Sequence, residues 1–249
     1  MQKFSKYNYS VLSFILLILL WQLLSILKVT PNLILPSPSD ILFSLFNDFS
    51  LLMYHLSMTL LVAILGLIIG IVLSFIVSIV LDYSKVMHKI IYPYLLISQT
   101  IPTIAIAPML VLWFGYGILP KLILVVITTI FPITISLLNG FSQCDREILL
   151  NLELLGASKK DVLFNYKIPY AISYLMAGVK ISVTYSIVSA VVSEWLGGFV
   201  GLGVYMIRVK KAFAYDKMFG AIIIIIIVSL LLILVVDKIN SYLKRRRLI

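Results

Sequence analysis

Residue types that carry catalysis or bind metals are scarce in this sequence and stand apart from one another. His55 and His88 have no cysteine or acidic partner at metal-ligand spacing, so no metal site is predicted. No Gly-x-x-x-x-Gly-Lys-Ser/Thr loop occurs, which excludes ATP hydrolysis by that machinery. The glycine-rich segment 197–203 follows an apolar run rather than a strand, so it is no dinucleotide fingerprint. We expect no catalytic residue and no cofactor bound by this chain.

Polar residues within long apolar runs are the remaining candidates for function, because lipid makes them costly. Glu194 stands beside Trp195 near the end of one run. It can line or gate the entry of a solute pathway. The alternative is an interfacial carboxylate that is wetted or paired with Arg208 or Lys210.

A second polar group, Ser98, Gln99 and Thr100, interrupts another apolar run. These side chains can line a pathway, or they can form hydrogen bonds between helices, as such residues commonly do in membranes. Together with Glu194 and Trp195 they form the candidate translocation pathway.

The elements that must position these residues are membrane helices. Of 249 residues, 62% are hydrophobic and 12% are charged, and the mean hydropathy is +1.13. A soluble domain carries about twice that charged share, and disordered chains have low hydrophobicity, so both classes are excluded. The net charge of +10 suits cytoplasmic loops beside anionic headgroups. Cys144 is alone, which excludes a disulfide framework and predicts a free thiol.

Six apolar runs reach the length of about 17–25 residues that a spanning helix needs. They cover residues 11–27, 56–81, 90–114, 121–138, 170–196 and 218–236. None alternates as barrel strands do, so we predict an all-α polytopic fold with one transmembrane domain over residues 1–249. The prolines at 93, 102 and 108 favour a place inside the bundle for the third span. The aliphatic first and sixth spans are expected on its outside.

The distribution of Lys and Arg predicts that both termini are cytoplasmic. With the N-terminus inside, the inner segments hold 13 of these residues: Lys3, Lys6, Lys85, Lys89, Arg146, Lys159, Lys160, Lys167, Lys238, Lys244, Arg245, Arg246 and Arg247. The outer segments hold six: Lys28, Lys121, Arg208, Lys210, Lys211 and Lys217. Lys180 lies within the fifth span, where it is expected to snorkel.

Two outer segments have local patterns. Ser39 is expected to cap an amphipathic helix whose apolar side carries Ile41, Leu42, Leu45 and Phe46. Such a helix would lie in the outer interface. The other segment, 197–217, is expected to begin with a flexible glycine turn.

The inner loop 139–169 has the most specific pattern. Ser142 or Asp145 can cap a helix that runs to Leu155, with apolar residues at helical spacing (Ile148, Leu149, Leu152, Leu155). Gly156 then takes the position where glycine enters the left-handed region freely. Ser158 and Asp161 form a capping box for a second short helix, which is expected to end before Pro169. A short apolar helix held there is either a docking element for a partner groove or a helix lying on the bilayer.

The same loop carries a family resemblance. Leu154-Leu155-Gly156-Ala157-Ser158, with Pro169 and the continuation Ala177-Gly178-Val179-Lys180, resembles the EAA loop of ABC-importer permeases. The opening Glu-Ala-Ala is absent, because Leu150-Asn151-Leu152 stands in its place. Leu35-Pro36-Ser37-Pro38-Ser39, Ile101-Pro102-Thr103-Ile104-Ala105, Leu112-Trp113-Phe114-Gly115 and Ser193-Glu194-Trp195-Leu196-Gly197 resemble the branch importing nitrate, sulfonates, taurine and thiamine precursors.

The resemblance implies a permease subunit without an ATPase site, working as a dimer by alternating access. Its implied partners are two cytoplasmic ATPases, which use ATP and Mg, and an external solute-binding protein. The implied solute is small and polar, such as a thiamine pyrimidine precursor or a sulfonate- or nitrate-like anion. The candidate ATPase-coupling residues are Leu152, Leu155, Gly156, Ala157, Ser158, Asp161, Val162, Leu163 and Pro169. An ion-coupled secondary transporter and the coupling component of a vitamin transporter are the alternatives.

Overall fold

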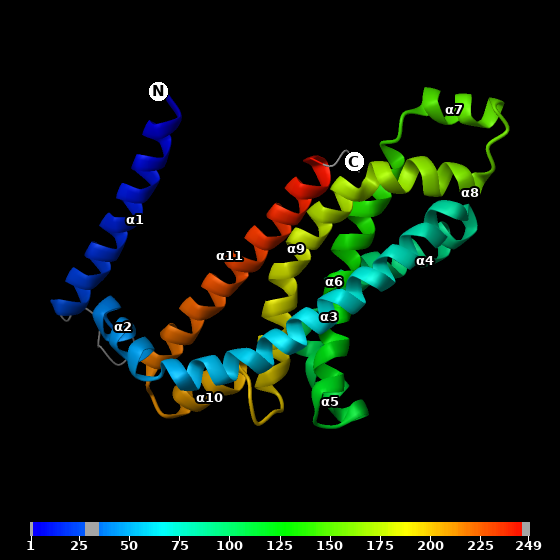
Figure 1. Cartoon of the computed structure of the whole chain (residues 1–249). Coiled ribbons are helices and arrows are strands. Elements are labelled where there is room, and N and C mark those ends of the chain that lie inside the picture. Colours follow the sequence, from blue (N-terminus) through cyan, green and yellow to red (C-terminus); the bar gives the residue numbers. More distant parts are fainter. Residues whose placement is uncertain (1, 28–34, 246–249) are drawn as a thin grey trace.

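The computed structural model describes residues 2–27 and 35–245, and all regular elements in these ranges are helices (Figure 1). Lys28, Arg246 and Arg247, which entered the charge count, lie outside the described residues. The helices are α1 (Gln2–Ile26), α2 (Pro38–Asn47), α3 (Phe49–Tyr83), α4 (Lys85–Thr100), α5 (Thr103–Phe114), α6 (Ile118–Ser142), α7 (Arg146–Leu154), α8 (Lys159–Val162), the π-helical turn η1 (Leu163–Lys167), α9 (Ile168–Trp195), α10 (Leu202–Lys211) and α11 (Tyr215–Arg245). The predicted all-α fold is confirmed.

Four of the described helical stretches are long and apolar enough to cross a membrane: α3, α6, the continuous run Lys159–Trp195, and α11. The pair α4–α5 makes a fifth span if its two bent helices count as one. The apolar part of α1, Val11–Ile26, is shorter. The predicted count of six spans is therefore not confirmed by helix length and composition.

The core lies where α3, α6 and α9 pack side by side, with α11 against α9. Its buried residues include Leu67 of α3, Ile133 and Leu137 of α6, Val183 of α9 and Val236 of α11. The α7–α8 hairpin closes one end of this bundle, and α10 lies at the other (Figure 1). These two ends are called the α7 end and the α10 end below.

Glycines allow α3 to approach α6 closely. A Cβ on Gly66 would overlap Val125, and one on Gly70 would overlap the side chain of Thr129. The two glycines are four residues apart on one helix face, the small-xxx-small spacing by which membrane helices pack backbone to backbone. Ser74 adds a hydrogen bond from its hydroxyl to the carbonyl of Ile130, at 3.0 Å.

The third predicted span is not one straight helix. It breaks at Ile101–Pro102 into α4 and α5, which are bent by 102°. Pro93 and Pro108 lie inside these helices without breaking them, so only Pro102 coincides with the break. Within the described chain α4 has no buried residue, whereas α5 buries Ala107 and Leu110 against α6, so the expectation that this span lies inside the bundle holds only for its α5 half. The peripheral position predicted for the first span is observed, since α1 contacts mainly α2 (Figure 1).

The cap of α2 also differs from the prediction. Ser37, not Ser39, is the N-cap, and it forms a capping box with Asp40. Pro38 follows at the first helical position, where a missing N–H has no effect on the helix. On the apolar side predicted for an interfacial helix, Ile41 is buried, whereas Leu42 and Phe46 are exposed.

We expect Gly70→Val to lower the free energy of unfolding by about 1–3 kcal/mol, since the new side chain overpacks the α3–α6 contact. Thermal unfolding of the purified permease in detergent measures the change. Ile69→Val, at the exposed neighbouring position, is the matched control. Equal unfolding midpoints for both variants would contradict the close packing at Gly70.

Candidate functional site

The hairpin at the α7 end is ordered by its caps. Asp145 is the N-cap of α7, and its carboxylate accepts a hydrogen bond from the Glu147 N–H at 2.8 Å. At the other end Ala157 N–H donates to Leu152 O, at 3.0 Å, and Gly156 N–H donates to Glu153 O, also at 3.0 Å. This pair of bonds is a Schellman motif, and Gly156 has the positive φ of 82° that the motif requires. The predicted glycine turn is confirmed.

The predicted capping box at α8 is also observed. Asp161 N–H donates to Ser158 Oγ at 3.2 Å, and Ser158 N–H donates to the Asp161 carboxylate at 3.1 Å. The hydrogen bonds from the hydroxyl and the N–H of Ser158 lower the pKa of Asp161. The box fixes the direction in which the chain leaves Gly156.

The short helix does not stop before Pro169. The chain continues from α8 through the π-helical turn η1 into α9, so that Lys159–Trp195 is one helical run. Ile168 N–H donates to Leu163 O, one residue further back than in an α-helix. Such a π-turn takes up an extra residue within a helix. Pro169 falls just after this turn, so the residue that lacks an N–H follows directly where the regular hydrogen-bond pattern of the helix is already interrupted.

The candidate coupling residues divide into exposed and buried groups. Leu154 and Leu155 are 86% and 84% exposed at the tip of the hairpin. Leu152, Ala157 and Val162 are half-buried. Leu163 is only 3% exposed and packs into the core beside Phe141, Ala171 and Val236. Its side chain therefore anchors the hairpin to the bundle and does not face outward with the others.

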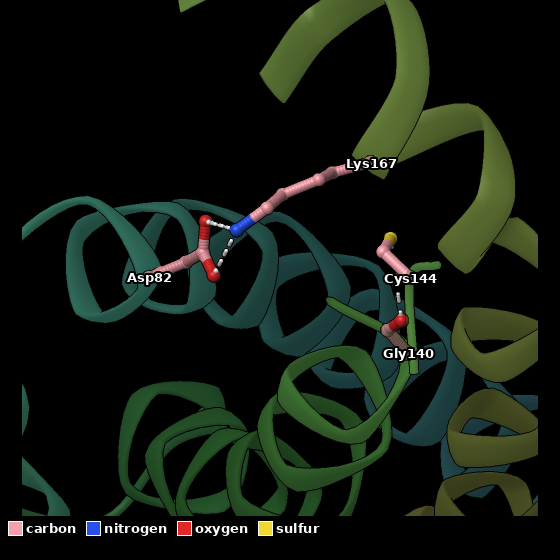
Figure 2. Close-up of polar contacts among 4 residues, drawn as sticks. All are labelled: Asp82, Gly140, Cys144 and Lys167. Atoms are coloured by element: carbon pink, nitrogen blue, oxygen red, sulfur yellow. Dashed lines mark hydrogen bonds and ion pairs between the residues drawn. The ribbon is translucent and has the colours of Figure 1, made fainter. Parts of the chain in front are cut away.

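A groove of about 690 Å³ separates the hairpin from the α3–α4 turn. Ala157 and Val162 line it from the hairpin, and Asp82 lines it from the end of α3. Lys167 reaches across, with its ammonium 2.9 Å from both carboxylate oxygens of Asp82 (Figure 2). This ion pair ties η1 to α3 and is partly shielded from water.

Cys144 lies beside this ion pair and is a free, buried thiol, as the sequence predicts (Figure 2). Its Sγ contacts the carbonyl of Gly140 at 3.8 Å. Burial raises the pKa of the Cys144 thiol, so the thiol stays protonated and acts as a small packing residue.

The predicted pathway residues do not meet in one place. Ser98 and Gln99 line a cavity of about 370 Å³ at the break between α4 and α5. Thr103 of α5, Thr128 and Ser136 of α6 and Tyr185 of α9 supply further polar groups to the same cavity. Thr100 does not line it; its hydroxyl donates to Ile97 O at 2.8 Å. We call this space the break cavity.

Glu194 lies at the α10 end, apart from the break cavity, and is 2% exposed. The hydroxyl of Thr59 lies 3.0 Å from each of its carboxylate oxygens, and Gly203 N–H donates to it at 2.9 Å. Leu202 N–H in turn donates to Thr59 Oγ1 at 2.8 Å. His55 Nδ1 accepts from Gly201 N–H at 3.0 Å. We call these contacts the Glu194 network.

The network corrects one alternative from the sequence. Glu194 is buried, so water does not surround it, and no ion pair joins it to Arg208 or Lys210 within the described residues. The guanidinium of Arg208 donates instead to Phe199 O at 2.9 Å. Trp195 is partly exposed beside the network. Thr59 is a partner of Glu194 that was not predicted from the sequence. A signal was present, since His55 and Thr59 are polar residues four apart on one face of an apolar span.

Two further ion pairs hold α11 in place. Lys180 was expected to snorkel, but its ammonium pairs with Asp237 at 2.7 Å. Asp48 pairs with Lys217 at 2.8 Å and accepts a hydrogen bond from the Tyr205 hydroxyl at 2.9 Å. Burial alone would raise the pKa of Asp48, but the bonds from Lys217 and Tyr205 outweigh it and lower that pKa.

Comparisons with known proteins agree with this architecture. A family model described as "Binding-protein-dependent transport system inner membrane component" matches residues 66–249. A probable ABC transporter permease protein of Haemophilus influenzae is 35% identical over 208 residues, 84% of this chain and 85% of that protein. The formylaminopyrimidine transport permease protein ThiX of Halalkalibacterium halodurans is 32% identical over 233 residues, 93% of each chain. A crystal structure of an amino acid ABC transporter shares the fold, with a TM-score of 0.65 and 19% identity over 82% of this chain and 97% of the other.

We expect Thr59→Val to lower the free energy of unfolding by at least about 2 kcal/mol. The change keeps the side-chain volume but removes a donor to Glu194 and the acceptor of the Leu202 N–H, which strands buried polar groups. Chemical unfolding in mild detergent measures the loss. Ser57→Ala, at an exposed position of the same helix, should change it by less than about 0.5 kcal/mol. Similar stabilities of the two variants would show that the network is dispensable.

Proposed function

We propose a solute, a route for that solute and an assembly for this chain. The chain belongs to the family of binding-protein-dependent transport system inner membrane components. It is the permease subunit of an ABC importer, a multi-pass membrane protein that relies on a separate ATPase subunit. The resemblance drawn from the sequence is confirmed, including the branch of sulfonate, taurine, nitrate and thiamine-precursor permeases.

The break cavity is the proposed route of the solute, and it is the observation that carries this proposal. Its polar groups come from four helices, so the cavity lies between helices of the bundle rather than on the surface of one of them. The bend at Ile101–Pro102 leaves backbone groups of α4 and α5 without helical partners. Irregular backbone at membrane depth is tolerated where it lines such a cavity. A volume of about 370 Å³ fits a small polar solute.

The proposed solute is a thiamine pyrimidine precursor or a small sulfonate- or nitrate-like anion. Relatives named for formylaminopyrimidine and for aliphatic sulfonates both align over most of this chain. The polar groups of the break cavity are hydroxyls and one amide, which can bind either class by hydrogen bonds.

The α7–α8 hairpin is the proposed docking element for the ATPase, which uses ATP and Mg. Leu154 and Leu155 supply an exposed apolar tip, and the caps at Gly156 and Ser158 hold it in one shape. The Asp82–Lys167 pair and the buried Leu163 link the hairpin to α3 and the core. Displacement of the hairpin by the ATPase would thus reach the spans and switch the access of the cavity, provided that the ATPase fits the two states differently.

The proposed assembly has two copies of this chain, two ATPases and an external solute-binding protein. The second copy would cover α4 and α5, where Tyr94, Ile97, Leu112 and Trp113 are exposed in the single chain. Both termini are proposed to be cytoplasmic. In support, the start of α1 and the end of α11 point toward the same side as the α7–α8 hairpin (Figure 1).

Gln99→Leu should reduce ATP-driven uptake at least about tenfold, because the cavity loses a group that binds the solute. Uptake is measured in proteoliposomes that contain the permease, the ATPase and the binding protein, with ion gradients collapsed by ionophores. Thr100→Val, at the neighbouring position outside the cavity, should leave uptake unchanged. Equal uptake by both variants would exclude this route.

Leu155→Arg should abolish recovery of the ATPase in a pull-down from detergent, because a charge buried in an apolar groove is costly. Leu155 is too exposed for the change to disturb packing within the permease. Leu42→Arg, at an exposed leucine of α2, is the control and should recover the ATPase fully. A helix that merely lies on the bilayer would tolerate the arginine, so full recovery with Leu155→Arg would argue against docking at this tip.

A cysteine introduced at Ser158 should react with a membrane-impermeant maleimide only when the inner face is accessible. One introduced at Ser50 should react only from outside, because the hairpin and the start of α3 lie at opposite ends of the bundle (Figure 1). Both positions are exposed, and Cys144→Ser provides the cysteine-free background. Labelling in intact cells and in inverted vesicles distinguishes the two. The reverse pattern would overturn the proposed orientation.

A further inference from the structure

Lys121 occupies an unfavourable position, and the opposite charge that faces it in the described chain, that of Glu194, does not touch it. It is 7% exposed and lies in the first turn of α6, where the helix dipole disfavours a positive charge. Its ammonium forms no ion pair or hydrogen bond with the described residues. A buried ionisable group in a membrane helix is by default a candidate for function.

The ammonium faces a cavity of about 310 Å³ at the α10 end. The cavity is lined by Tyr116, Gly117, Lys121, Glu194, Gly198 and Phe199, among others. The chain lies close to the ammonium on one side, since a Cβ on Gly198 would be 2.6 Å from Lys121 Nζ. Gly117, the N-cap of α6, offers no side chain to the first N–H groups of that helix. A buried cation and an uncapped helix start therefore border the same space.

Glu194 does not neutralise Lys121 by direct contact. Its carboxylate is occupied by Thr59 and by the Gly203 N–H, and no ion pair joins it to Lys121. It is the one acid among the residues that line the cavity. The ammonium thus keeps its hydrogen-bonding capacity for a ligand in the cavity, and the chemistry that it selects is an anion.

We propose that this cavity is a second solute site, which takes a small monovalent anion with terminal oxygens, such as a sulfonate, before it passes to the break cavity. Lys121 would donate to the anion, and the first N–H groups of α6 would support the same charge. That the anion is the transported solute rests on the proposed function. Binding of the anion is measured on the permease alone and does not depend on transport. A phospholipid phosphate offers the same chemistry and is tested as the alternative source.

Trifluoromethanesulfonate is the probe, observed by fluorine NMR with the full-length permease in phosphatidylcholine nanodiscs. Saturable binding is expected, displaced by methanesulfonate and not by the neutral dimethyl sulfone. Lys121→Met should weaken it at least about tenfold, the loss of one charge-assisted hydrogen bond. Lys210→Met removes an exposed lysine of α10 and should leave it unchanged. Equal affinities of wild type and Lys121→Met would overturn the proposal.

The double variant Lys121→Met with Glu194→Gln covers the case in which Lys121→Met alone fails to fold. It removes both charges, and the same loss of binding is expected; retained binding would overturn the proposal. Dodecyl maltoside micelles, which carry no phosphate, identify the source of the anion. Probe binding that is present in these micelles and absent from the phosphatidylcholine nanodiscs would assign the site to a lipid phosphate and overturn the solute assignment.

The result of this binding test does not depend on the result of the uptake test for the break cavity. Probe binding that requires Lys121, together with full uptake by Gln99→Leu, would support this site and reject the proposed route. Absence of saturable probe binding, together with impaired uptake by Gln99→Leu, would reject this site and leave the route standing.

Discussion

The buried carboxylate of Glu194 sets the geometry of one end of this permease. A charge with 2% exposure must be hydrogen-bonded, and its donors come from two other helices, α3 and α10. The N–H groups at the start of α10 have side-chain acceptors in place of helical ones, because they donate to Glu194, Thr59 and His55. This contact also requires glycine at 201 and 203. A Cβ at either position would overlap Glu194 or the chain before it.

The opposite end is built differently. The α7–α8 hairpin has an exposed apolar tip and is joined to the bundle at few points, chiefly the Asp82–Lys167 pair and Leu163. Its caps satisfy the helix ends within the hairpin itself, so it is a defined element rather than an irregular loop. The continuous run from α8 through η1 into α9 connects the hairpin directly to the core. One end is thus held together by buried polar contacts, whereas the other presents an exposed apolar tip.

Between these ends, close packing and cavities occupy different parts of the molecule. Gly66 and Gly70 bring α3 against α6 without space for a side chain. The bent pair α4–α5 lies at the periphery and leaves the break cavity between itself and α6 and α9. A second cavity holds the buried Lys121 near the Glu194 network. Both spaces lie beside the closely packed unit formed by α3, α6 and α9.

Local sequence determined the features that depend on neighbouring residues. Apolar run length predicted the four long apolar helices of the described chain. Gly156, Ser158 and Asp161 predicted the turn and capping box, because caps are formed within a few residues. The tertiary structure decided which residues meet. Pairing of Glu194 with Thr59 joins positions 135 residues apart, and no local pattern specifies such a partner. It also decided that α4 is peripheral and that Leu163 is buried, because burial depends on which helices pack together. The chain continues as a helix past Pro169, because the π-turn before it accommodates a residue that would otherwise break the helix.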